Sequence, residues 1–448
     1  MLLFFCCCAL PRLKNDRFLD GRKPGRSKKF RAAISPAYDD SVLLSRDISK
    51  YWVIDRSQRK ITILCQDGRE LTEEIPEDSD ILASQIDITI FDWERWWITS
   101  QTNRGHLIVA EAYSPRTEDP LHGRPSVYLD QNHWSTLAQA IFDPSQIKHP
   151  AERDAADELI HLAQDGGVVL PMSSGNVRET ANLYGDHRYK VGASLASLSG
   201  GWQLRHPLAV WRAELMRVLA QRHGVEVPAV ATLPVVTLEP HALLDDDVQA
   251  HAMEPDDPQL FILAMSNPSV LLELLVEPGK AERIDPHAWV RSNRDFAEHL
   301  ASGPYTKPQK EQAAYARAWT ENGSMVTAAL RELGLATGDN AMKPKEIQKL
   351  FAHMPALGAF TKLMVMRQIN VSHKWRPNDL TDLIFLSCAA GYVDYVAAEK
   401  HTGTQLRQLN RSMPHGTDTS NVHTSLGPLV EKIRSDGVTT ASEGPIGR

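Results

Sequence analysis

Hydrophobic and polar residues alternate along residues 51–113, and this pattern predicts a β-rich module near the N-terminal side of the chain. The expected strands cover residues 52–54, 61–65, 86–90 and 106–110. The first two would form a hairpin across the polar residues between them. Three closely spaced tryptophans are expected to pack in the core or to cover the sheet: Trp93, Trp96 and Trp97. We expect this small module to span residues 48–114.

Beyond residue 125, short apolar segments alternate with helical periodicity, which favours an α/β fold. Residues 127–129 and 168–170 are strand formers, and a helical pattern follows each of them. The same order returns near the C-terminal end, where a helix from residue 379 leads into a strand that ends just before Glu399. Strands and helices that alternate at this spacing predict a parallel sheet flanked by helices, with right-handed crossovers.

A mostly helical block interrupts the α/β pattern at about residues 186–370. Its expected helices, separated by proline and glycine residues, lie at residues 208–221, 259–265, 270–275, 311–333 and 345–366. We interpret the block as a large helical insertion within one α/β domain that covers residues 126–412. A short helix and a loose tail are expected over residues 413–448.

Composition and charge limit the classes of partner. The chain has 448 residues and a net charge of −7, so no positive field of the whole protein attracts nucleic acid. A polyanion would have to be held by local basic patches or by a metal ion. Residues 1–45 are basic and are expected to be disordered. Residues 1–10 are too short to span a bilayer, and they indicate either an anchor or an incorrectly assigned start codon.

The cysteines indicate a reducing compartment. There are five, three of them consecutive, and they offer neither a disulfide framework nor the spacing of a zinc site. Cys65 and Cys388 lie in apolar segments and are expected to be buried thiols. No stretch of the chain is long and apolar enough for a membrane span, so we expect a cytoplasmic protein with no membrane partner.

Four acidic residues occupy positions that a parallel sheet would bring together. Asp130 follows the first strand, Glu179 lies in the helix after the second, Asp382 opens a helix with Asp379, and Glu399 follows the last strand. The carboxyl ends of parallel strands share one edge of the sheet. Ionised carboxylates repel one another and are stable at close range only with a cation between them. Because the ligands would all be oxygen atoms, Mg²⁺ or Mn²⁺ is the expected ion.

These segments resemble PIN-domain ribonucleases over residues 128–132, 170–173 and 378–400. In that family an aspartate ends the first strand, a glutamate follows the second, and a third acid opens the helix before the strand that carries the fourth. Asp130, Glu179 and Asp382 match those positions. Glu399 matches the fourth, although the family more often has an aspartate after a threonine, and Ala398 replaces that threonine here.

The resemblance covers about residues 126–185 and 375–410 and implies a PIN-like fold. It further implies a metal-dependent endoribonuclease that hydrolyses RNA, often as a toxin or defence component in bacteria. Single-stranded DNA remains an alternative substrate. An inhibitory or activating protein partner, and association of the chain with itself, are further partners that this class allows.

Two groups of residues could support such a site. Asn132 and Ser173, together with Asp379, could orient carboxylates or water. Basic residues after Glu179 could form a substrate wall that holds phosphates, with Trp202 and Trp211 to stack bases: Arg188, Lys190, Arg205 and Arg212. The competing interpretation is a solvated helix face with the tryptophans in the core.

Two other functions compete with the nuclease. One is a phosphatase of the haloacid-dehalogenase type with Asp130 as the nucleophile, but Asn132 occupies the place where that chemistry usually has a second aspartate. The other is a non-catalytic interaction protein. In that case Asp382 and its neighbours would only cap the positive end of a helix, and Glu179 would only face solvent.

Overall fold

The computed structural model describes residues 49–77, 82, 85–112, 121–239, 242–245, 272, 275–276, 286–336, 342–409 and 419–438. The expected disordered segment at residues 1–45 and the expected helix at residues 259–265 lie outside the described residues, as does most of residues 270–275. Among the described helices, none has the length and hydropathy needed to cross a membrane.

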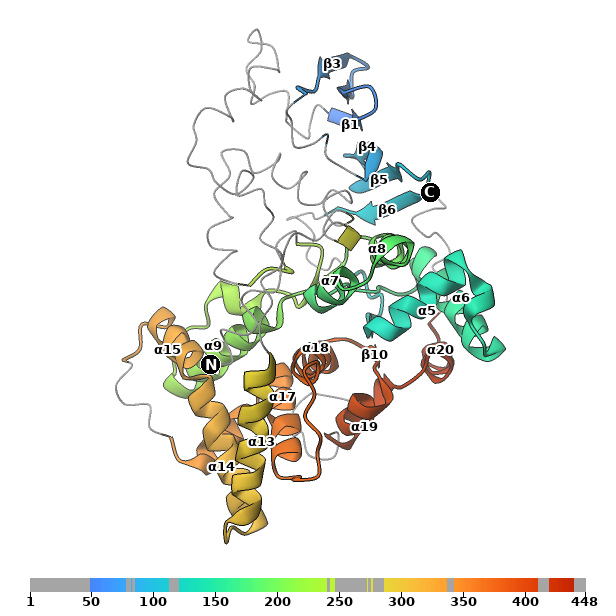
Figure 1. Ribbon diagram of the computed structural model, residues 1–448. Coiled ribbons are helices and arrows are strands. Elements are labelled where there is room, and N and C mark those ends of the chain that lie inside the picture. Colours follow the sequence, from blue (N-terminus) through green and yellow to red (C-terminus); the bar gives the residue numbers. More distant parts are fainter. Residues whose placement is uncertain are drawn as a thin grey trace.

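The N-terminal module is a six-stranded antiparallel sheet (blue to cyan in Figure 1). Its strands are β1 (Ser49–Asp55), β2 (Lys60–Cys65), β3 (Glu70–Glu74), β4 (Ile86–Asp92), β5 (Trp97–Thr102) and β6 (Leu107–Glu111), in the order β3-β2-β1-β4-β5-β6. The expected hairpin is confirmed. Trp93 is 5% exposed and packs on Trp52 and Phe91, as expected for a core residue. The sequence pattern missed β3 and β5, and β3 is exposed at four of its five positions.

A short parallel sheet forms the centre of the chain. It consists of β7 (Val127–Leu129), β10 (Tyr395–Ala397) and β11 (Val422–His423), in the order β11-β10-β7. Each residue of β7 and β10 is buried, which explains their uninterrupted apolar sequences. The expected strand at residues 168–170 is reduced to one parallel bridge between Val169 and Ser126. A second bridge, from Met172, extends the sheet to β8 (Gln203–Leu204), which pairs antiparallel with β9 (Val236–Thr237).

Helices cover both sides of this sheet. They are α5 (Gln131–Phe142), α6 (Pro150–Gln164), α7 (Ser174–Ala181), α8 (Gly185–Ser199), α9 (Pro207–His223), α18 (Asp379–Tyr392), α19 (Lys400–Leu409) and α20 (Leu426–Ser435). Local sequence sets several of their ends. Proline occupies the start of α6 and α9, and α9 ends at Gly224, whose left-handed backbone (φ 66°) is the usual helix stop. The chain is therefore a mixed α/β protein.

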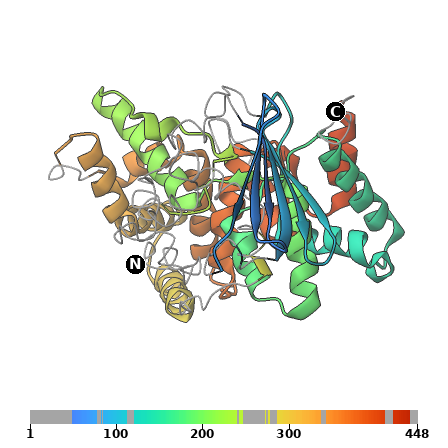
Figure 2. The same ribbon diagram turned by 90° about the horizontal axis from the view of Figure 1, so that it is seen from above.

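The block at residues 186–370 is largely but not wholly helical. It contains β8 and β9 as well as α13 (Pro286–Ser302), α14 (Lys307–Glu321), α15 (Gly323–Glu332), α16 (Pro344–Phe351) and α17 (Pro355–Gln368). The two long helices expected here are each split in two, at Asn322–Gly323 and before Pro355. In the view from above, the N-terminal sheet projects between α13–α15 and α5–α6 (Figure 2), and the side view shows it next to α8 at one end of the molecule (Figure 1).

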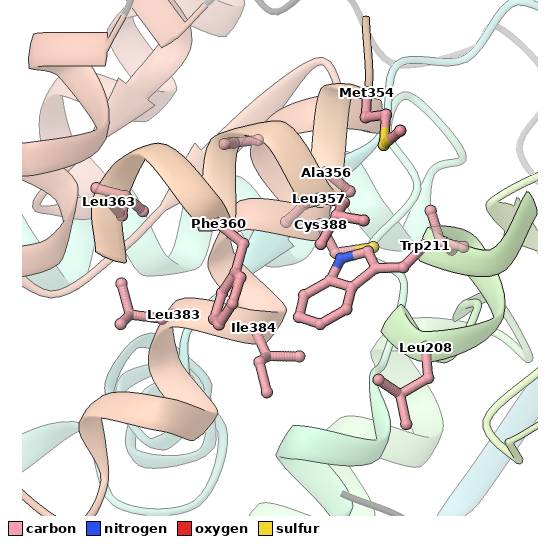
Figure 3. Close-up of a cluster of buried hydrophobic side chains, with 14 of the residues drawn as sticks. Leu208, Trp211, Met354, Ala356, Leu357, Phe360, Leu363, Leu383, Ile384 and Cys388 are labelled. Atoms are coloured by element: carbon pink, nitrogen blue, oxygen red, sulfur yellow. The ribbon is translucent and has the colours of Figure 1, made fainter. Parts of the chain in front are cut away.

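The largest apolar core joins α9, α17 and α18 (Figure 3). Trp211 packs on Phe360 with ring centroids 4.6 Å apart, and Ile384 and Cys388 of α18 lie in the same cluster. Both predicted thiols, Cys65 and Cys388, are free and buried. This core fixes α17 and α18 side by side, and both helices contribute to the site described next.

Candidate metal centre

Asp130 and Glu399 meet where the central strands β7 and β10 end. Asp130 is the N-cap of α5, and its Oδ1 accepts a hydrogen bond from the backbone N–H of Gln131 at 2.8 Å. Its Oδ2 accepts a hydrogen bond from the backbone N–H of Glu399 at 3.1 Å. Because β7 and β10 are parallel neighbours, residues far apart in sequence are joined here by direct contact, as the sequence predicted.

Glu179 is carried to this edge by α7, whose start is fixed by a capping box. Ser173 and Asn176 exchange side-chain and backbone hydrogen bonds at the first turn of the helix. The buried Gln131, next to Asp130, donates to the hydroxyl of Thr180 at 3.0 Å. This bond ties the start of α5 to the turn of α7 that carries Glu179, so the two acids have a common rigid support.

Asp382 and Asp379 lie in the first turn of α18, and they differ in role. Asp379 is 7% exposed, and its Oδ2 accepts the backbone N–H of Arg376 at 2.8 Å. Arg367 and His373 also lie at ion-pair distance from its carboxylate, at 3.4 and 3.5 Å. Burial raises the pKa of Asp379, but its bonds to His373 and to the Arg376 backbone and the charge of Arg367 together hold it below the ordinary value. Asp379 therefore anchors the helix.

Arg367 of α17 provides a buried positive charge behind the acids. It is 1% exposed, and it donates to Gln405 at 2.9 Å and to the hydroxyl of Thr402 at 3.4 Å. Thr402 in turn donates to Oε1 of Glu399 at 3.3 Å. Burial lowers the pKa of the Arg367 guanidinium, and the nearby acids, Asp379, Asp382 and Glu399, oppose that effect.

The electrostatics of the four acids show that they share one environment. Burial raises the pKa of Glu179 to about 7, with a further contribution from the charge of Asp130 and a smaller one from Glu399, while Arg178 opposes both. Burial raises the pKa of Asp382 to about 8, and the charges of Asp130, Glu179 and Glu399 add to it. Four carboxylates from α5, α7, α18 and the end of β10 thus interact across one edge of the sheet.

The donor set fits a hard divalent cation, although the side chains are not gathered around one point. Within the described part of the chain, no three Asp, Glu, His or Cys side chains are close enough together to hold one ion. Carboxylates that repel one another are expected to turn apart, and a cation would draw them together by side-chain rotation. All four donors are carboxylate oxygens, which favour Mg²⁺ or Mn²⁺ over zinc.

The two expected supporting residues are placed differently by the structure. Ser173 is fully buried, and its hydroxyl bonds Asn176 and lies 3.0 Å from the hydroxyl of Tyr128. It therefore positions α7 and does not orient a carboxylate directly. Asn132 is exposed on the first turn of α5, and its side chain makes no hydrogen bond to any described residue. Neither residue contacts the acids in the way that we expected.

The expected substrate wall is not supported, because its basic side chains are held by other partners. Arg188 donates to the main-chain carbonyls of Leu183, Ala181 and Val276. Lys190 pairs with Asp186, Arg205 with Glu239 and Arg212 with Glu332. The expected stacking tryptophans are core residues: Trp202 is 2% exposed and Trp211 is 1% exposed.

Sequence reasoning missed several residues that support the acids. Gln131 and Thr180 directly follow Asp130 and Glu179, so their neighbourhood was a usable signal. Arg178, which donates to the hydroxyl of Thr381 at 3.4 Å, bridges α7 and α18 beside the acids. Arg367 gave no signal, because it lies in the helical block and reaches the site only through the packing of α17 on α18.

Comparisons of the chain with models of protein families, with curated proteins and with solved structures found no match. Function must therefore be inferred from the chemistry of the site itself.

Proposed function

We propose that the chain is a metal-dependent nuclease, most simply an endoribonuclease with a PIN-like catalytic domain. The observation that supports this proposal best is that Asp130 and Glu399 are in contact at the carboxyl edge of a parallel sheet, and that their charges raise the pKa values of Glu179 and Asp382. Burial is the main cause of the raised pKa values of Glu179 and Asp382, and the charges of the neighbouring acids raise them further. Strong perturbation of clustered acids is typical of functional sites.

The residues divide the work between them. Asp130 is held by two backbone N–H groups, which fix its direction and leave lone pairs on both oxygens for a cation. Glu399 is fixed on the other side by Thr402 and, through it, by Arg367. A bound Mg²⁺ or Mn²⁺ would supply the activated water and would stabilise charge on the phosphoryl oxygens. Glu179 and Asp382, whose side chains make no such hydrogen bond to a residue that the structure describes, would complete the ion's ligands.

The test is cleavage of a single-stranded RNA in the presence of added Mg²⁺ or Mn²⁺. We expect Asp130→Asn and Asp382→Asn each to lower the rate by more than about 100-fold, since even outer partners of a metal ligand contribute 10- to 100-fold. EDTA should abolish cleavage. If both variants retain the metal-dependent activity of the wild type, the assignment of this site is wrong.

Asp394→Asn is the matched control for Glu399→Gln. Asp394 stands immediately before β10, at the end opposite Glu399, and its carboxylate accepts the backbone and hydroxyl of Ser126. We expect the Asp394 variant to keep cleavage and the Glu399 variant to lose it. A phosphoryl group trapped on Asp130 would instead support the phosphatase.

A further inference from the structure

Two segments beside the acids carry positive charge and no acid of their own. The loop of residues 369–378, between α17 and α18, holds Lys374 and Arg376. Helix α19 holds Lys400, His401 and Arg407. Neither segment contains an Asp or a Glu, in a chain whose net charge is −7. We call these five residues the basic rim.

The basic rim is exposed and its charges are not neutralised. All five residues are exposed to solvent. Among the residues that the structure describes, none of the four Lys and Arg side chains has an ion-pair partner, whereas the arginines at positions 205 and 212 are held by glutamates. Unpaired surface cations in an acidic protein are suited to a polyanion.

Contacts between the two segments place the basic rim against the carboxylates. The His373 and His401 rings are stacked, with centroids 5.8 Å apart and an angle of 10° between their planes. The same loop binds Asp379 through the backbone N–H of Arg376. On the other segment, Lys400 directly follows Glu399, and α18 packs on α19.

We propose that the basic rim binds the sugar-phosphate backbone of single-stranded RNA next to the carboxylates, and that His401 stacks on an unpaired base. This inference rests on the proposed function and names the surface that would hold its substrate. Lys400 and Arg407 are seven residues apart, so they share one face of α19 and stand roughly 10 Å apart along its axis, where both can contact phosphates of one strand. Stacking on a histidine requires an unstacked base, which selects single strands over duplexes.

The test is fluorescence-anisotropy binding of a labelled single-stranded RNA of roughly 12 nucleotides, within the range that such surfaces cover. The protein carries Asp130→Asn, so the probe is not cut. The test variant adds Lys374→Ala, Arg376→Ala and Lys400→Ala. The matched control removes three exposed positive charges on α16 and at its N-cap instead, with Lys343→Ala, Lys345→Ala and Lys349→Ala. That helix packs near the start of α17, while Arg367 lies near the far end of α17.

We expect the rim variant to bind roughly 100-fold more weakly at about 0.1 M salt, and the slope of log K against log salt to fall in magnitude by about 2. The control should bind like its parent. His401→Ala should weaken binding about ten-fold with an unchanged salt slope, and His401→Phe should restore it, because stacking needs only an aromatic face. Rim and control variants that bind alike would overturn the inference, even if cleavage is observed. If the rim substitutions weaken binding as expected but the protein with Asp130 intact never cleaves RNA, the proposed function is overturned while the role of the basic rim in RNA binding is supported.

Discussion

Burial and the charges of neighbouring acids strongly favour the protonated form of Asp382. Its pKa rises to about 8 from an ordinary value of 3.8, and that of Glu179 rises to about 7 from 4.5. The folded protein therefore holds protons that the unfolded chain has already lost between these values. The free energy of unfolding consequently falls as pH rises from about 4 to about 8. The contribution of these two protons is complete only below the unfolded-state pKa values and is lost as pH rises through the folded-state values.

We therefore expect Asp382→Asn to stabilise the metal-free protein at pH 8. The amide removes a charge that costs a few kcal/mol to bury, so the thermal midpoint in EDTA should rise by several degrees. At pH 5 the difference between the two midpoints should be much smaller, because the folded protein holds the Asp382 proton and pH 5 lies only a little above the ordinary pKa of 3.8 at which the unfolded chain loses it. Differential scanning fluorimetry at both pH values makes the comparison. If the Asp382→Asn variant is less stable than the wild type at pH 8, the ionised carboxylate of Asp382 does not destabilise the folded protein, and this account is wrong.

The same two acids predict proton release when a metal binds. At pH 6 both are protonated in the metal-free protein, so binding of Mn²⁺ should release about two protons, and at pH 9 almost none. Titration calorimetry in two buffers with different ionisation enthalpies counts the protons. Binding that releases no proton at pH 6 would mean that the ion is held elsewhere.

Arg367 is the residue whose removal we expect to be most damaging. Arg367→Met removes the buried guanidinium that pairs with the carboxylate of Asp379, and breaking a buried ion pair typically costs about 3–5 kcal/mol. Chemical denaturation measures the loss. Adding Asp379→Asn should recover part of it, because the unpaired charge is then gone. If the double variant is as unstable as the sum of the two single variants, the pair does not act as a unit.

At the scale of elements, α17 and α18 connect the candidate site to a second buried anchor. Glu214 of α9 is 1% exposed and accepts the N–H groups of Ala356 and Leu357 at the start of α17. It also accepts the hydroxyl of Tyr392 at the end of α18. The opposite ends of these two helices carry Arg367 and Asp382. The packing of α17 on α18 therefore sets the position of Asp382 relative to Arg367.

A substitution at Gly391 tests the close packing of α18 on the start of α17. A Cβ there would stand 2.9 Å from the carbonyl carbon of Pro355 and 3.0 Å from the nitrogen of Ala356, both backbone atoms that cannot move aside alone. We expect Gly391→Ala to cost about 1–3 kcal/mol in denaturant unfolding. Gly427→Ala in α20 is the control, because nothing lies within 4 Å and alanine suits a helix. Equal stability of the two variants would contradict the close approach of α17 and α18.

Much of this arrangement could be predicted from local sequence. Uninterrupted apolar triplets located β7 and β10, and proline and glycine located the helix ends. Asp130 and Glu399 were recognisable by their places after strands, Asp382 by its place at a helix start, and Glu179 by its place in the helix after the second predicted strand. The exposed, acidic β3 carries no alternation, so it could not be seen. The sequence left open whether the basic residues near Arg205 hold a substrate, because it does not show that Arg205 pairs with the half-buried Glu239 or that Arg212 pairs with Glu332. Partners brought together by long-range packing, such as Arg367 and Thr402, are determined only by the fold.

At the scale of the whole molecule, the N-terminal sheet is attached to the α/β part by specific polar contacts. Glu111 at the end of β6 pairs with Arg124 through two hydrogen bonds of 2.7 and 2.9 Å, and it also accepts the indole N–H of Trp202. Tyr189 of α8 donates to Thr102 at the end of β5. The sheet is thus fixed to α8 and to the approach to β7, so it can stiffen the strand that ends at Asp130.

The charge distribution separates two roles on one molecule. The chain is acidic as a whole, and its four candidate acids lie along one edge of the sheet. The basic rim borders that edge, and its Lys and Arg side chains form no ion pair within the described part of the chain. A polyanionic substrate would be repelled by most of the surface and attracted at the basic rim. Binding of such a substrate would therefore depend mainly on the five residues of the basic rim.

The central claim is that Asp130, Glu179, Asp382 and Glu399 hold one catalytic metal centre, and diffraction from crystals soaked in Mn²⁺ tests it most directly. We predict an anomalous peak with carboxylate oxygens of at least three of these residues at about 2.0–2.3 Å, and loss of that peak in Asp130→Asn crystals. A protein that cleaves RNA with Mn²⁺ but shows the peak elsewhere, or shows none at these four acids, would contradict the claim.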